Sequence, residues 1–110
     1  MNTNESEKLK ELINNRKFIE NNGRILRILN VVGNENRLKD IHYVLSDMEQ
    51  ESFKYSVNYL CESGYIKLFN GSTKAEIALS ASNYDELYVK ITPDGIKLLT
   101  GKKSDDCIEV

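Results

Sequence analysis

Few side chains in this 110-residue sequence belong to the sets that carry out acid–base, nucleophilic or metal chemistry. His42 is the single histidine, and it lies at the margin of the apolar face of a predicted helix, which favours a packed ring. A zinc site needs four clustered ligands, which this histidine and the distant Cys61 and Cys107 cannot supply. No glycine-rich phosphate loop, paired-carboxylate cleft or Ser/His/Asp set is visible. The sequence therefore predicts a protein that is not an enzyme and that has no catalytic residues, metal or cofactor.

Charge is nearly balanced along the whole chain. Fifteen basic and 17 acidic side chains give a formal net charge of -2. Strong nonspecific nucleic-acid binders are usually basic overall, so this balance argues against DNA binding by bulk charge alone. The balance does not exclude a local basic patch, because residues 1–40 carry eight basic and six acidic side chains.

The sequence favours a cytoplasmic protein with no membrane partner. Residues 1–10 are polar and charged, unlike the apolar core of a secretory signal. The longest apolar runs fall far short of the roughly 20 residues that a membrane-spanning helix needs. In a cytosolic protein Cys61 and Cys107 are expected to stay reduced.

The apolar spacing of the first third predicts two helices separated by a break. Residues 4–20 carry a partial apolar stripe, and residues 24–32 are apolar on most sides. Asn21-Asn22-Gly23 interrupts the pattern, because asparagine and glycine favour turns. Asn22 is therefore the expected N-cap of the second helix, and Gly33 is the residue that ends it.

Two further helices are predicted with almost no linker between them. Residues 38–48 repeat apolar side chains at three- and four-residue spacing, and residues 50–63 do the same around Phe53. Asp47 followed by Gln50 resembles a capping box at the start of the second of these helices.

After Gly64 the hydrophobic period changes from 3.6 to 2, which predicts strands. Residues 65–69 alternate, and residues 75–79 are expected to pair back through a tight turn at Asn70-Gly71. Residues 87–91 form the clearest strand. No all-helical fold would need this change of period, so the fold class is α+β.

A short last helix is predicted to begin at Thr92-Pro93. Thr92 can cap it, and Pro93 suits the first helical position, where its missing N–H is not needed. Residues 101–110 are then expected to form a polar tail.

Two of these segments resemble the winged helix-turn-helix family. The stretches CESGYIKL and LYVKITPDG carry the likeness, through the glycine-led strand after a helix and the strand that runs into Thr92-Pro93-Asp94-Gly95. The resemblance covers residues 24–99 and implies a three-helix core with a β-hairpin wing, plus an N-terminal helix and a short C-terminal helix. It divides the chain into an arm at 1–22, a winged-helix domain at 23–100 and a tail at 101–110. More loosely, the chain is similar to small phage-encoded winged-helix proteins.

The resemblance places residues 50–63 in the position of a DNA recognition helix. At 100° per residue, with Phe53 inward, the outward positions are Glu51, Tyr55, Asn58 and Glu62, flanked by Ser52, Lys54 and Tyr59. The implied function is sequence-specific binding of double-stranded DNA by a small transcriptional regulator. The implied contacts come from Ser52, Lys54, Tyr55 and Asn58 on the helix and from Lys67 and Lys74 on the wing.

A protein–protein interaction module with the same fold is the alternative. Glu51 and Glu62 lie on the outward face, where a polyanion would repel them. Lys67 and Lys74 are also the kind of residue that keeps an exposed strand edge from aggregating. Fold alone does not decide between the two functions.

The N-terminal helix needs a covering surface for its apolar residues. These are Leu9, Leu12, Ile13, Phe18 and Ile19. They are expected to pack either on their own domain or on a second subunit, which would make a homodimer through this helix.

Overall fold

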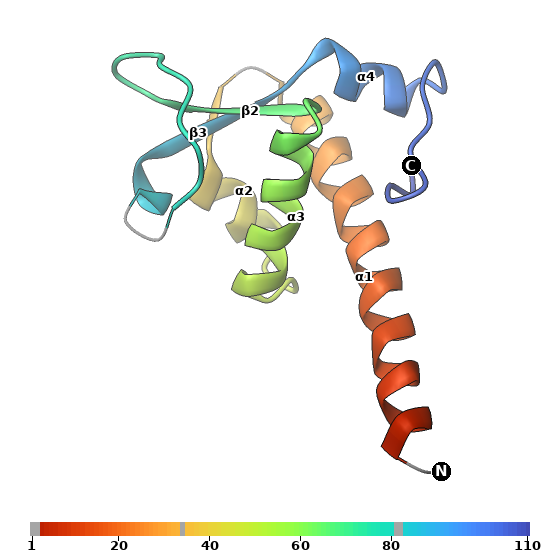
Figure 1. Cartoon of the computed structure of the whole chain (residues 1–110). Coiled ribbons are helices and arrows are strands. Elements are labelled where there is room, and N and C mark those ends of the chain that lie inside the picture. The colour runs from red at the N-terminus through yellow and green to blue at the C-terminus, as the bar shows by residue number, and fades with distance from the viewer. Residues whose placement is uncertain (1–2, 34, 81–82) are drawn as a thin grey trace.

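The protein is an α+β chain in which helices cover one side of a small antiparallel sheet (Figure 1). The computed structural model describes residues 3–33, 35–80 and 83–110. The elements in these ranges are α1 (Thr3–Val32), β1 (Asn36–Arg37), α2 (Leu38–Val44), α3 (Gln50–Glu62), β2 (Ile66–Asn70), η1 (Tyr84–Glu86), β3 (Leu87–Ile91) and α4 (Pro93–Leu99). Within the same ranges, no helix has the length and apolar character needed to cross a membrane.

The first helix corrects the sequence-based prediction. Instead of two helices separated at Asn21-Asn22-Gly23, α1 runs without a break from Thr3 to Val32. Asn22 is consequently not an N-cap: it lies inside the helix and is fully buried. The N-terminal helix and the first helix of the domain are one element, whose N-terminal half projects past the rest of the molecule (Figure 1).

Contacts with the C-terminal segment explain why the break does not form. The side-chain amide of Asn22 donates to the carbonyl of Cys107 at 2.8 Å, and the N–H of Glu109 donates to the carbonyl of Ile19 at 3.2 Å. A Cβ on Gly23 would lie 1.6 Å from the carbonyl oxygen of Glu109, so only glycine lets the backbone come this close. These tertiary contacts override the local preference of the sequence for a turn.

The segment that was expected to be a polar tail is therefore packed against the domain. Ile108 is buried, and Arg27 donates to the carbonyl of Glu109 at 3.0 Å. Asp105 accepts hydrogen bonds from the hydroxyls of Tyr59 and Tyr65, each at 2.8 Å to the same carboxylate oxygen. Residues 105–109 thus join α1 to α3 and to the start of β2.

The link between α2 and α3 also differs from the prediction. α2 ends at Val44, and the expected helix over residues 45–48 is a turn, in which Met48 N–H donates to the Leu45 carbonyl. The capping box at Asp47 and Gln50 is wrong, because Glu49 is the N-cap of α3 and makes no side-chain capping bond. Asp47 instead pairs with Arg24 of α1.

The sheet has the order β1-β3-β2, with both pairs antiparallel. Ile66 lies opposite Ile91 and Leu68 opposite Val89, so the apolar side chains of β2 and β3 share the face toward the helices. The two-residue strand β1 was not predicted, and it completes the far edge of β3 by pairing Asn36 with Val89.

The connection after β2 is wider than the predicted tight turn. Gly71 does not have positive φ. The Asn70 side chain accepts from the N–H groups of Ser72 and Thr73, and Lys74 adopts a φ of 63°. The expected strand at 75–79 is reduced to one bridge, Phe69 to Glu76. A Cβ at Gly71 would lie 2.3 Å from the Tyr88 ring, so a larger residue there would displace this ring.

The start of α4 and the end of α3 confirm two local predictions. Thr92 is the N-cap of α4, accepting from Gly95 N–H at 3.2 Å, and Pro93 is the first helical residue. Gly64 follows α3 with a φ of 82°, which is the conformation that ends a helix.

One apolar core joins the helices to the inner face of the sheet. Its fully buried members come from α1, α2, α3, both long strands and α4: Ile25, Leu26, Leu29, Leu38, Phe53, Val57, Leu60, Ile66, Leu68, Leu87, Val89 and Leu98. α3 is thereby fixed on its inner side, which leaves its other side to solvent.

Candidate nucleic-acid interface

The outward face of α3 is the surface that the sequence placed in contact with DNA. Glu51, Ser52, Tyr55, Asn58 and Glu62 are exposed. Phe53, Val57 and Leu60 are buried on the opposite side. The assignment of inward and outward positions from a 100° period is therefore confirmed, including the two glutamates at either end of the exposed face.

Lys54 is half-buried and points toward the wing side of α3. Its Nζ lies 4.9 Å from the centre of the Tyr84 ring, a cation–π geometry. Tyr84 in turn meets Nδ1 of His42 at 3.1 Å. The imidazole stacks on Phe53 with ring centres 4.4 Å apart, and its Nε2 lies 2.9 Å from the Met48 carbonyl. Since a carbonyl only accepts, Nε2 carries the proton, and His42 is a packing residue that fixes α3 to α2 and η1.

Both wing lysines named from the sequence have carboxylate partners. Lys67 Nζ lies 3.2 Å from Glu76, and Lys74 Nζ lies 2.5 Å from Glu35. Lys74 also lies 5.7 Å from the centre of the Phe69 ring. These side chains are largely exposed, so the pairs are weak in water and can be exchanged for a stronger anion.

The outer face of the sheet adds cations that sequence reasoning missed. Arg37 donates to the hydroxyl of Tyr88 at 3.2 Å, and Lys90 Nζ lies 5.7 Å from the centre of the Phe69 ring. The alternation of β2 and β3 was the available signal, because the residues between the core positions must face outward. The pairing of Arg37 with Tyr88 had no such signal, since β1 has only two residues.

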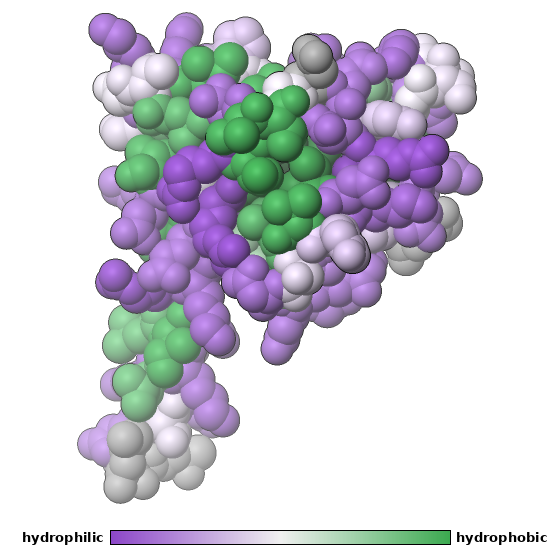
Figure 2. Space-filling view, turned by 180° about the vertical axis from the view of Figure 1, so that it is seen from behind, coloured by the Kyte–Doolittle hydropathy of each residue, from purple (hydrophilic) through white to green (hydrophobic). Residues whose placement is uncertain are grey.

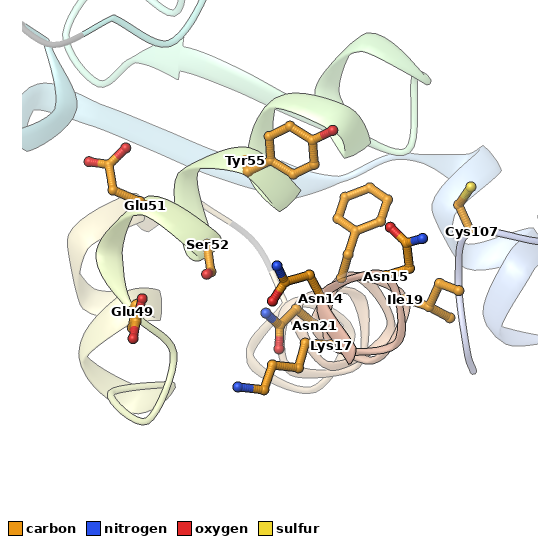
Figure 3. Close-up of a pocket in the computed structure, with 11 residues that line it drawn as sticks. Asn14, Asn15, Lys17, Ile19, Asn21, Glu49, Glu51, Ser52, Tyr55 and Cys107 are labelled. Carbon is orange, nitrogen blue, oxygen red and sulfur yellow. The ribbon is translucent and has the colours of Figure 1, made fainter. Parts of the chain in front are cut away.

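A groove separates α3 from the N-terminal half of α1 (Figure 3). Its volume is about 910 Å³. The side chains along it are mostly polar: Asn14, Asn15, Lys17, Phe18, Ile19 and Asn21 from α1, Glu49, Glu51, Ser52 and Tyr55 from the α3 side, and Cys107. Phe18 closes one part of the groove by edge-to-face contacts with Tyr55 and Tyr59, with ring centres 5.1 and 5.2 Å apart. Ser52 and Tyr55 therefore face this groove as well as open solvent.

Three basic groups on and around α3 have partners within the molecule. Arg24 makes a two-point contact with Asp47 at 2.6 and 2.9 Å, and these hydrogen bonds lower the pKa of the Asp47 carboxyl. Lys54 is directed at an aromatic ring and Lys67 at a carboxylate. A basic strip from α1 across α3 to the wing would consist of Arg24, Lys54 and Lys67. Each of these side chains contacts a carboxylate or an aromatic ring of the same chain.

Asp105 anchors the C-terminal segment beside α3 as a charged acceptor. Partial burial alone would raise the pKa of its carboxyl, but hydrogen bonds from the Cys107 N–H and from Tyr65 and Tyr59 outweigh burial and lower it. Burial and the hydrogen bond to this carboxylate raise the pKa of Tyr65 to about 12. The hydroxyls of Tyr59 and Tyr65 therefore stay protonated donors near neutral pH.

No cluster of three or more His, Cys, Asp or Glu side chains in the described part of the chain is placed to hold a metal ion. A scan of family models, a search of curated proteins and a search of solved structures each gave no match. The candidate interface is therefore judged on its own geometry.

Proposed function

We propose that this chain is a winged-helix DNA-binding protein that acts as a small transcriptional regulator, of the kind that phages encode. In this proposal α3 is the recognition helix, the β2–β3 pair is the wing, and no catalytic step is involved. The observation that carries the proposal is the position of α3. It follows α2 across a short turn, its inner side is held in the core, and its outer face is exposed.

The order of elements supports the fold part of the proposal. A helix, a short strand, two helices and then two antiparallel strands follow one another, and the strands close a sheet with β3 in the middle. Apart from the short strand β1, this order agrees with the three-helix core and hairpin that the resemblance to the winged-helix family implies for residues 24–99. The hairpin extends away from α3 at one end of the molecule, where a wing can reach a neighbouring groove (Figure 1).

The side chains divide into base-reading and phosphate-binding roles. Asn58 and Ser52 supply neutral hydrogen-bonding groups for base edges, and Tyr55 supplies a hydroxyl on a ring that Phe18 holds in place. Lys67 and Lys74 bind phosphate, helped by the cations on the sheet face. Lys54 extends the phosphate contacts from the helix toward the wing.

Salt dependence of duplex binding tests this proposal. Each neutralised phosphate contributes about -0.9 to the slope of log affinity against log salt, so a few contacts give weak binding and a shallow slope. Lys67→Ala should weaken binding and reduce the slope by about one. Glu76→Gln should tighten binding, because it releases Lys67 from its carboxylate. Glu51→Gln with Glu62→Gln should tighten binding to any sequence.

The measurement is fluorescence anisotropy of a labelled duplex at several salt concentrations. Lys102→Ala is the matched control, since it removes an exposed lysine beyond α4 and should leave the slope unchanged. Absence of binding at low salt by both the parent and the double glutamine variant would refute the DNA role of α3.

An interaction module without DNA binding is the second candidate, and two observations favour it. Carboxylates engage the basic residues Arg24, Lys67 and Lys74 within the molecule. Apolar side chains that suit a protein partner are also exposed at the end of α1, Val31 and Val32, and on α2, Tyr43 and Val44. A protein that fails the DNA titration but stays folded belongs to this class.

The proposal also includes a homodimer formed through the N-terminal half of α1. A dimer carries two copies of α3 and of the wing, which doubles the small number of basic contacts available to one duplex.

A further inference from the structure

The N-terminal half of α1 is a helix with an apolar side that its own domain does not cover. Every side chain from Asn4 to Lys17 is exposed, and this part of the helix projects beyond the rest of the molecule (Figure 1). Leu9, Leu12 and Ile13 expose 47%, 66% and 49% of their surface. Figure 2 shows this hydrophobic surface on the projecting helix, at the lower left of the view. Because this half of α1 gains little from packing within its own chain, a second surface would stabilise it.

Two exposed leucines, Leu9 and Leu12, lie in a stripe with coiled-coil spacing whose other positions are charged or half-buried. Leu9, Leu12, Arg16 and Ile19 follow one another at spacings of three, four and three, and Glu5 continues the pattern toward the N-terminus. Ile13 widens the stripe beside Leu12. At its other end the stripe stops at the packed C-terminal segment, where Ile19 is half-buried and its carbonyl accepts the Glu109 N–H. The open part of the stripe therefore runs from Glu5 to Arg16.

We propose that a second copy of this chain covers this stripe, with the two helices antiparallel and Leu9 of each packed against Leu12 of the other. This inference rests on the homodimer of the proposed function and specifies its register. The antiparallel pairing makes a two-fold symmetric interface, to which each subunit contributes the same residues. The two-fold axis passes between Lys10 and Glu11, and the two domains lie at opposite ends of the paired helices.

Charge complementarity selects this register. It sets Glu5 of each chain opposite Arg16 of the other, so an ion pair closes each end of the leucine layers. The methylene groups of Lys8 fall beside Ile13 of the other chain and cover it. Because Arg16 and its intrahelical partner Glu20 are 77% and 44% exposed, that internal pair offers little resistance to the new one.

Other pairings fail one of these conditions. Moving the antiparallel pair by one heptad sets Leu12 against Arg16, which buries a charge among apolar side chains. A parallel pair sets Glu5 against Glu5 and Arg16 against Arg16, which is repulsive at both ends. A second copy in the stated register is thus the occupant that satisfies both the apolar and the charged positions.

Sedimentation equilibrium of the full chain, without DNA, tests the surface. Leu9→Ala and Leu12→Ala should each raise the dimer dissociation constant about 30-fold, because the buried methyl and methylene groups are lost twice per dimer. Glu7→Gln, on the opposite side of the helix, should leave it unchanged. Circular dichroism of each variant checks that the domain remains folded. A parent chain that stays monomeric at millimolar concentration would overturn the proposal.

Charge exchange tests the register. Glu5→Arg alone and Arg16→Glu alone should each weaken the dimer by roughly tenfold, since each places like charges together at both ends. The double variant Glu5→Arg with Arg16→Glu should return the dissociation constant to within about twofold of the parent. Single variants that dimerise as well as the parent would exclude the antiparallel register. Duplex titration of the Leu12→Ala variant, at a concentration where it is monomeric, keeps the DNA proposal separate, because its α3 and wing are intact.

Discussion

Gly23 lies in the middle of a 30-residue helix, where replacing it with alanine sets two opposing effects against each other. Helix propensity alone predicts that Gly23→Ala stabilises the protein by about 1 kcal/mol. The packing predicts the reverse, because the new Cβ would lie 1.6 Å from the Glu109 carbonyl oxygen, and a backbone atom cannot turn aside as a flexible side chain can. We expect the steric conflict to outweigh the gain in helix propensity, so that Gly23→Ala destabilises the protein.

The size of the loss follows from what the C-terminal segment gives up when it is displaced. Three hydrogen bonds are broken: Asn22 to Cys107, Arg27 to Glu109, and Glu109 to Ile19. Each is worth about 1 kcal/mol, and burial of Ile108 adds roughly 2 kcal/mol. After the gain in helix propensity, Gly23→Ala should lower the free energy of unfolding by about 4 kcal/mol if residues 107–109 detach while Asp105 keeps its hydrogen bonds to Tyr59 and Tyr65.

Urea denaturation followed by circular dichroism measures this change. The decisive control is the same substitution in a chain that ends at residue 104, where no carbonyl obstructs the new methyl group. There Gly23→Ala should stabilise by about 1 kcal/mol, so the substitution changes sign with the C-terminal segment. If Gly23→Ala stabilises the full chain as well, the close approach of Glu109 to α1 does not exist in solution and the reasoning fails.

Three further substitutions test the contacts that hold α3 and the wing. Asp105→Asn should cost about 1–2 kcal/mol at pH 7, because Tyr59 and Tyr65 lose a charged acceptor. Since the folded-state pKa of Asp105 is lowered, this difference should be full above about pH 4 and should disappear as the pH falls through the folded-state value, as acid titrations of urea midpoints would show. Thr92→Ala should cost about 1 kcal/mol in thermal unfolding, through loss of the α4 cap; Thr92→Ser, which keeps the hydroxyl, should recover most of it. His42→Ala should cost about 2–3 kcal/mol by urea unfolding, because a stacked ring and two hydrogen bonds are removed, and a cost below 0.5 kcal/mol would contradict the packing role.

The sequence correctly predicted those features of the fold that depend only on residues close together in the chain. Thr92 and Pro93 start α4, and Gly64 ends α3, because a cap needs only groups within one turn of the helix. The alternation of residues 87–91 correctly predicted β3, and the 100° period correctly predicted which side of α3 is exposed.

The failures occurred where distant residues decide the outcome. The sequence Asn22-Gly23 predicted a break between two helices. In the structure these residues contact Cys107 and Glu109, which lie far along the chain. A glycine inside an apolar helical pattern can also signal a close backbone approach, which is what Gly23 provides. The partners of the candidate site residues could not be predicted either, because Lys74 and Glu35, like Lys54 and Tyr84, are far apart in the sequence.

The docking of residues 105–109 on α1 has a consequence for the order in which the protein is made. Asn22 and Arg27 are synthesised early, yet their acceptors lie 85 and 82 residues later in the chain. Until residues 105–109 are synthesised, the Asn22 amide can bond only to water or to its own helix, and Gly23 lowers the local helix stability by about 1 kcal/mol relative to alanine. We therefore expect α1 to bend more readily at Asn22-Gly23 during synthesis than in the complete chain, where residues 107–109 pack against this point.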